Sequence, residues 1–229
     1  LDKLLNLLDT EINKTTNLYT KGCFLVAMST VNWSEQQLPK VLQIFQSQQD
    51  INEIPGLQDN EKQNEYRSYC KKYFSALRTV SWGKKQLPEI FNTLKKCVDN
   101  PHIKMFCLQA FARINWSATY LPEILRIFQQ ESQTNNDSYI GRCISDVQWS
   151  SEQLASVQNL LTERIDYIDK QHLDQEALID VIRDGIRLIN WLPEQLPAIH
   201  KLIPPNLFIR PSTNISENTV FTFVCFHLN

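Results

Sequence analysis

Five copies of one pattern, each centred on a tryptophan, constrain the fold of this 229-residue chain more than any other feature. Successive tryptophans lie 49, 34, 33 and 42 residues apart. Self-similarity at a spacing of about 20 to 50 residues is typical of repeat architectures. We therefore interpret the five tryptophans as the structural core of a repeat, with an exposed aromatic ladder that binds a ligand as the alternative: Trp33, Trp82, Trp116, Trp149 and Trp191.

Apolar or small residues precede each tryptophan by nine, six, five and two positions in every copy. These offsets follow the i, i+3, i+4, i+7 spacing of one face of an amphipathic helix. We expect a first helix that ends near the tryptophan. The position six residues before the tryptophan is small in all copies, which would let a neighbouring helix approach closely: Ala27, Ala76, Ala110, Cys143 and Gly185.

A second helix is predicted after each tryptophan. Leucine stands five residues after it in every copy, and apolar residues follow at eight and twelve. Proline follows this leucine in four of the five copies, and Ala155 takes its place in the copy of Trp149. Proline fits the first turn of a helix, where its missing N–H leaves no bond unmade. The second helix begins either at this proline or a turn earlier, with Ser34, Ser117 or Ser150 as N-cap, and the sequence leaves both starts open.

Stacking of these helix pairs gives the expected fold. A single pair cannot bury its apolar faces alone, so neighbouring pairs must stack. We predict an all-α chain in which residues 1–203 form a right-handed α-solenoid of about five antiparallel helix pairs plus a leading half-pair. Residues 1–12 match the second-helix pattern, so we interpret the chain as opening mid-repeat, within a longer solenoid. The two longer tryptophan spacings predict insertions at 46–61 and 163–175.

The repeat ends at Pro204 and Pro205, because two consecutive prolines cannot continue a helix. Residues 204–229 hold no further copy of the pattern. Residues 220–229 are β-branched and aromatic without any charge, so we expect an extended or capping tail.

Composition bounds the class of protein. A net charge of −2 disfavours a general nucleic-acid surface, and no apolar run approaches the length of a membrane span. Six scattered cysteines without a C-x-x-C pair favour buried, reduced thiols and a reducing, cytoplasmic compartment, with secretion into a host cell as a compatible setting. We expect no metal and no cofactor, because no histidine has a ligand at metal-binding spacing: His102, His172, His200 and His227.

No catalytic motif is present, so we expect no enzymatic activity. Arginines on the polar faces of the first helices are the candidate partner-binding residues: Arg78, Arg113, Arg142, Arg183 and Arg187. Consecutive first helices lie side by side in a solenoid, so these side chains would form a basic stripe. Such a stripe suits an acidic peptide or a phosphate, since arginine bonds both in bidentate fashion. Arginines on an ordinary solvated face are the alternative reading.

The helix pairs, the period near 34 and the twelve-residue separation of alanine and proline resemble the tetratricopeptide class of repeats. Three copies carry this separation, beginning at Ala27, Ala76 and Ala110. The resemblance implies a superhelix with a concave peptide-binding face; HEAT-like pairs are the alternative architecture.

These observations predict a non-enzymatic scaffold that binds a protein or peptide along the solenoid surface. A bacterial effector or an adaptor is one setting that fits. The alternative function is an accessory region of a larger enzyme whose catalytic domain lies outside this segment. Single-stranded RNA binding by the arginine stripe is a third hypothesis, which the net charge of −2 disfavours.

Overall fold

A computed structural model describes residues 1–48, 60–134, 139–170, 186 and 189–202. These residues form helices and turns, with no strand among them, so the all-α prediction is confirmed for this part of the chain. The helices are α1 (Asp2–Lys14), α2 (Leu18–Ser29), α3 (Leu38–Ser47), α4 (Asn60–Thr79), α5 (Leu87–Cys97), α6 (Lys104–Arg113), α7 (Leu121–Thr134), α8 (Tyr139–Asp146), α9 (Ser151–Lys170), the 3₁₀ helix η2 (Pro193–Gln195) and α11 (Leu196–Leu202).

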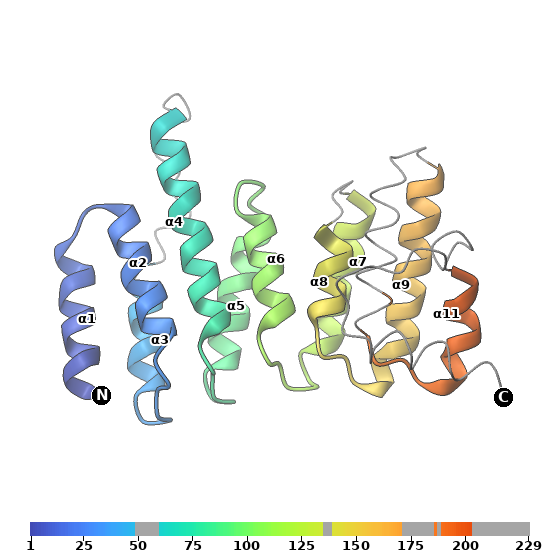
Figure 1. The fold of residues 1–229 in the computed structure, drawn as a ribbon, viewed down its shortest axis with the longest axis horizontal. Helices are drawn as coiled ribbons and strands as arrows, with labels where there is room; N and C mark the ends of the chain where they lie inside the picture. Colours follow the sequence, from blue (N-terminus) through green and yellow to red (C-terminus); the bar gives the residue numbers. More distant parts are fainter. Residues whose placement is uncertain (49–59, 135–138, 171–185, 187–188, 203–229) are drawn as a thin grey trace, which may run out of the picture.

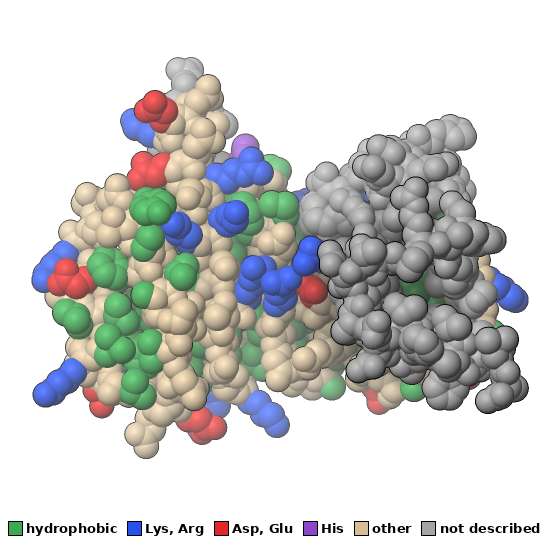
Figure 2. Space-filling view, in the orientation of Figure 1, with side chains coloured by type: hydrophobic (Ala, Val, Ile, Leu, Met, Phe, Trp, Pro, Cys, Tyr) green, Lys and Arg blue, Asp and Glu red, His purple; other side chains and the backbone are tan. Residues whose placement is uncertain are grey.

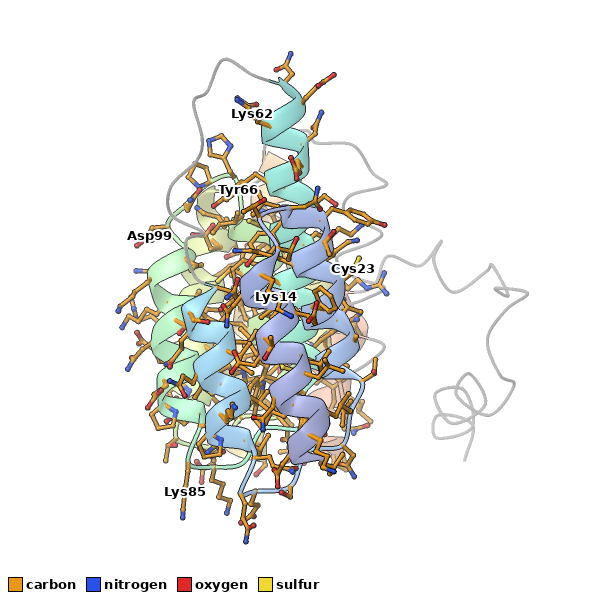
Figure 3. The ribbon with its side chains drawn as sticks, turned by 90° about the vertical axis from the view of Figure 1, so that its left-hand side faces the viewer. Lys14, Cys23, Lys62, Tyr66, Lys85 and Asp99 are labelled. Atoms are coloured by element: carbon orange, nitrogen blue, oxygen red, sulfur yellow. The ribbon has the colours of Figure 1, made fainter. Side chains whose placement is uncertain are left out.

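The helices stand side by side in two layers. The first helices α2, α4, α6 and α8 follow one another in a row, and each contacts the next (Figure 1). The second helices α3 and α5 lie on the opposite side from α2 when the row is viewed from its end (Figure 3). This arrangement buries the apolar stripe of each helix between the layers.

Each tryptophan ends its first helix by the same hydrogen bond. The last turn of a helix leaves carbonyl groups without partners inside the helix. Every indole Nε1–H donates to the carbonyl five residues earlier, which belongs to this last turn in α2, α4, α6 and α8. The five bonds measure 2.8, 2.6, 2.7, 2.7 and 2.9 Å, in the order Trp33, Trp82, Trp116, Trp149 and Trp191.

The presence of proline decides where the second helix begins. In α3, α5, α7 and α11 the helix starts at the leucine directly before the proline, after one irregular or 3₁₀ turn. Proline has no N–H to donate to the carbonyl four residues earlier, so a full α-turn does not form before it. Ala155 keeps that N–H, and α9 begins at Ser151, a turn sooner. Both of the helix starts that the sequence left open therefore occur: the later start where proline follows the leucine, and the earlier start where alanine does.

Two columns of the second helix form the centre of the core. The residues eight and twelve positions after the tryptophan are 0 % exposed in α3, α5, α7 and α9: Val41, Phe45, Ile90, Leu94, Ile124, Phe128, Val157 and Leu161. In α1 the matching Leu4 is 39 % exposed and Leu8 is only partly buried. No described first helix precedes α1 to cover these positions.

The burial of the small residue six positions before each tryptophan also depends on the neighbouring helix. Ala76, Ala110 and Cys143 are buried where α4, α6 and α8 each follow another first helix. Ala27 is exposed, because α2 is the first described member of that row. The expected close approach therefore occurs in three copies, and Gly185 lies outside the described residues.

The longer tryptophan spacings are taken up partly by longer helices. Helix α4 begins at Asn60 and α9 continues to Lys170, so each has 20 residues. The predicted insertion at 163–175 is therefore a continuation of α9 as far as residue 170. Residues 49–59 of the other predicted insertion and the predicted tail, 204–229, lie outside the described residues.

A polar link of the same register joins successive second helices from α1 to α7. The residue thirteen positions after one tryptophan contacts the residue seven positions after the next, counting α1 by its matching leucines. Asp9 pairs with Lys40 at 3.5 Å, and Lys95 pairs with Glu123 at 2.8 Å. Between them, Gln46 donates to Glu89 at 2.7 Å. The link persists although its chemistry changes from copy to copy.

The Glu123 link predicts a pH-dependent contribution to stability. Hydrogen bonds from Arg126 and then Lys95 lower the pKa of Glu123 to about 2. Because the folded pKa lies below the ordinary value of 4.5, this contribution is present above pH 4.5 and is lost as the pH falls towards 2. We expect Glu123→Gln to cost under about 1 kcal/mol at pH 7, since solvent screens the pair. Urea midpoints of the wild type and the variant at several pH values should show this cost shrinking in acid. A difference that stays constant with pH would contradict the assignment.

Candidate functional site

Three of the five candidate arginines come together on the row of first helices. Arg78 lies in the last turn of α4, Arg113 ends α6, and Arg142 lies within α8. Arg113 and Arg142 are exposed and Arg78 is half-buried. Arg183 and Arg187 lie outside the described residues. Figure 2 shows basic side chains gathered near the centre of this face, beside the residues drawn in grey.

Different offsets from the tryptophan still place these arginines on one helix face. They stand four, three and seven residues before it. Positions three or four residues apart are neighbours on a helix surface. The offset of seven is therefore one turn away from the other two, on the same side. The arginines therefore share a helix face although they do not share one position relative to the tryptophan.

Asp146 is a residue of this cluster that the sequence did not identify as a candidate. Its carboxylate Oδ2 accepts a hydrogen bond from Arg113 Nε at 2.7 Å. Asp146 stands three residues before Trp149, the same column that Arg113 occupies before Trp116. The equal columns of α6 and α8 meet at this pair, and testing equal columns of neighbouring first helices for opposite charges would have identified it.

Among the described residues, the arginine cluster has more positive than negative charge. Burial is the main cause that lowers the pKa of Arg78, and repulsion from Arg113 adds to it. Asp146 opposes this shift, and Arg142 contributes in the same direction as Arg113. Within the described part of the chain, only Arg113 of the three forms an ion pair. In the described part of the chain, Asp146 is thus the one carboxylate near these three guanidinium groups, and it bonds only Arg113, which favours binding of an anion.

The tryptophans have a different role. Trp33 and Trp116 are buried, and Trp82, Trp149 and Trp191 are partly buried against the core. All five indole N–H groups are engaged by backbone carbonyls. They offer no free donor to a ligand.

The buried thiols are poorly suited to chemistry. Burial raises the pKa of Cys70 and Cys143 to about 12 and that of Cys97 to about 11. The pKa of Cys107 is also raised by burial, and its Sγ–H donates to the carbonyl of Leu94 at 3.0 Å. The thiolate is the form that attacks electrophiles and binds metals. Across the described residues, no three histidine, cysteine or acidic side chains are placed to hold a metal ion.

We expect one cysteine to react much faster than the four buried ones. Cys23 is exposed on α2, whereas Cys70, Cys97, Cys107 and Cys143 are buried. Brief treatment of the native protein with iodoacetamide, followed by peptide mass spectrometry, should modify Cys23 before these four. All should react at similar rates in denaturant. Fast modification of any of the four under native conditions would contradict the packing described above.

No helix of the described chain combines the length and apolar character needed to cross a bilayer. Comparison of the chain with protein-family models, with curated proteins and with solved structures gave no significant match.

Proposed function

We propose that this chain is a non-enzymatic scaffold that binds another protein on the face formed by α2, α4, α6 and α8. The observation that carries the proposal is the cluster of Arg78, Arg113 and Arg142 beside Asp146, the one carboxylate that the described residues place near them. An excess of guanidinium groups on a packed surface favours recognition of an anionic partner.

The arrangement of the helices supports the same proposal. Stacked helix pairs present long surfaces on which a partner contacts several repeats. The resemblance to tetratricopeptide repeats is consistent with such a surface, and we propose that the two-layered row is an α-solenoid of this general kind. The first-helix face is the better candidate, because it contains the arginine cluster.

Charge-matched variants test this function. We expect the wild-type chain to recover a stoichiometric protein partner from extracts of its source cells or its host. The triple variant Arg78→Gln, Arg113→Gln, Arg142→Gln should lose that partner, because the anionic groups lose their donors. The control variant Lys84→Gln, Lys85→Gln, Lys96→Gln removes the same charge from other positions and should retain it.

Stability and salt dependence complete this test. Arg113 and Arg142 are exposed and Arg78 is half-buried, so the triple variant should unfold within about 1 to 2 kcal/mol of the wild type. Binding of the wild type should weaken with salt, and binding of the lysine control should weaken equally. A partner that the arginine variant retains at wild-type affinity would overturn the assignment of this face.

A further inference from the structure

The outward face of α2 is apolar, unlike that of an ordinary surface helix. Tyr19 is 56 % exposed and Val26 is 37 % exposed, and Cys23 and Ala27 are exposed between and beside them. Positions 19, 23 and 26 follow the i, i+4, i+7 spacing of one helix face. Figure 3 shows Cys23 on the outer side of α2, and Figure 2 shows apolar side chains gathered over α1 and α2. We call Tyr19, Cys23 and Val26 the α2 patch, because Ala27 belongs to the small residues six positions before the tryptophan, which pack against the preceding first helix in α4, α6 and α8.

Lys72 of α4 packs against two residues of the α2 patch. Its Nζ lies 3.6 Å from the centre of the Tyr19 ring and 3.6 Å from Cys23 Sγ. The side chain reaches this position from α4 by passing over Gly22, where an added Cβ would lie 2.7 Å from Lys72 Cδ. A side chain at position 22 would therefore force Lys72 to shift from its place over α2. Arg78, Arg113 and Arg142 lie farther along the same row of helices, on α4, α6 and α8.

We propose that the partner segment is extended and bipartite, with an aromatic or aliphatic anchor on the α2 patch and acidic residues over Arg78, Arg113 and Arg142. This inference rests on the proposed function and specifies its ligand. Exposed apolar surface favours an apolar side chain, and the excess of guanidinium groups selects carboxylates. The occupant is thus an acidic segment of another protein, which crosses the helices from α2 to α8.

Helix spacing sets the length of this segment. Packed helices lie about 8–10 Å apart, so the three steps from α2 to α8 span roughly 24–30 Å. An extended chain advances about 3.3 Å per residue, which gives about seven to nine residues. The acidic residues would lie about three residues apart, because each successive helix contributes one arginine. A helix of the same number of residues spans less than half this distance.

Synthetic peptides of defined composition test the proposal directly. The probe is a fluorescein-labelled peptide with tryptophan and leucine at one end and three glutamates at the other. A series varies the separation between the tryptophan and the last glutamate from about three to about nine residues. We expect fluorescence anisotropy to show the tightest binding at about seven to nine residues. Replacing the glutamates by glutamines or the apolar pair by serines should each weaken binding about tenfold or more.

Matched protein variants assign each end of the peptide to its surface. Tyr19→Ser with Val26→Ser should weaken the parent peptide but leave the serine-ended peptide unaffected. Arg113→Gln with Arg142→Gln should weaken the parent peptide but leave the glutamine peptide unaffected. Only the acidic end should contribute the salt dependence. Circular dichroism and urea unfolding confirm that each variant remains folded.

Four results would overturn the bipartite segment. They are the absence of binding by every peptide of the series, equal binding by the glutamine peptide, insensitivity to the α2 variants, and tighter binding of a single-stranded RNA oligonucleotide or of phosphoserine peptides only. If the arginine variants also retain the protein partner in the pull-down, the proposed function itself fails. If they lose that partner while the peptides do not bind, the scaffold stands and only the extended acidic ligand is rejected.

Discussion

Trp116→Ala should lower the free energy of unfolding by about 3–5 kcal/mol, the range for a buried aromatic residue. The Trp116 side chain is 8 % exposed, and its ring centre lies 5.5–5.9 Å from those of Phe91, Phe111 and Tyr120. Its Nε1–H also donates to the Phe111 carbonyl at 2.7 Å. The substitution therefore leaves a cavity and a carbonyl without its partner at the end of α6. Urea denaturation followed by circular dichroism measures the loss.

Trp116→Phe separates the hydrogen bond from the packing. Phenylalanine retains most of the apolar contact but has no N–H, so we expect a cost of about 1–3 kcal/mol. Tyr120→Phe is the control, since it changes a neighbouring aromatic residue that is only partly buried. If Trp116→Phe costs no more than this control, the indole bond contributes nothing to the end of the helix.

Arg164→Ala should be the most damaging substitution of a charged residue in the described chain, at about 2–5 kcal/mol. The Arg164 side chain is 1 % exposed, although it carries a charge, and it belongs to α9. Its Nη1–H donates to the carbonyl of Ser132 at 2.7 Å, in the last turn of α7. Alanine would remove a large buried side chain and leave this carbonyl without its donor.

Two further variants separate the causes of the expected loss of stability in Arg164→Ala. Arg126→Ala removes an exposed arginine that pairs with Glu123, and surface pairs contribute under about 1 kcal/mol. Arg164→Met keeps much of the buried volume without the donor, so it should recover part of the loss. Unfolding midpoints for the three variants in urea give the order. Equal midpoints for Arg164→Ala and Arg126→Ala would show that Arg164 has no structural role.

The repeat could be found in the sequence because packing between layers imposes a fixed register. Every first helix ends just before its tryptophan, and the same indole bond explains why. The leucine five residues later marks the start of each proline-containing second helix. These features depend on contacts within one copy of the pattern, so each copy shows them by itself.

Contacts between copies were harder to predict. The pairing of Arg113 with Asp146 joins two copies through the same column. The early start of α9 follows from Ala155, a single departure from the pattern whose consequence depends on a backbone N–H. The exposed face of α2 could not be inferred, because its apolar residues resemble core residues until the neighbours of each position are known.

The polar links between second helices also favour one order of the helix pairs. Asp9 meets Lys40, and Lys95 meets Glu123. If the units containing α3 and α5 were permuted, the same register would bring Asp9 opposite Glu89 and Lys95 opposite Lys40. These two of the three new adjacencies join like charges, whereas the third places Gln46 opposite Glu123, a pair of the same kind as the native Gln46 and Glu89. Each like-charge contact costs little, but both oppose the shuffled arrangement. The units therefore share one backbone plan and yet are not fully interchangeable modules.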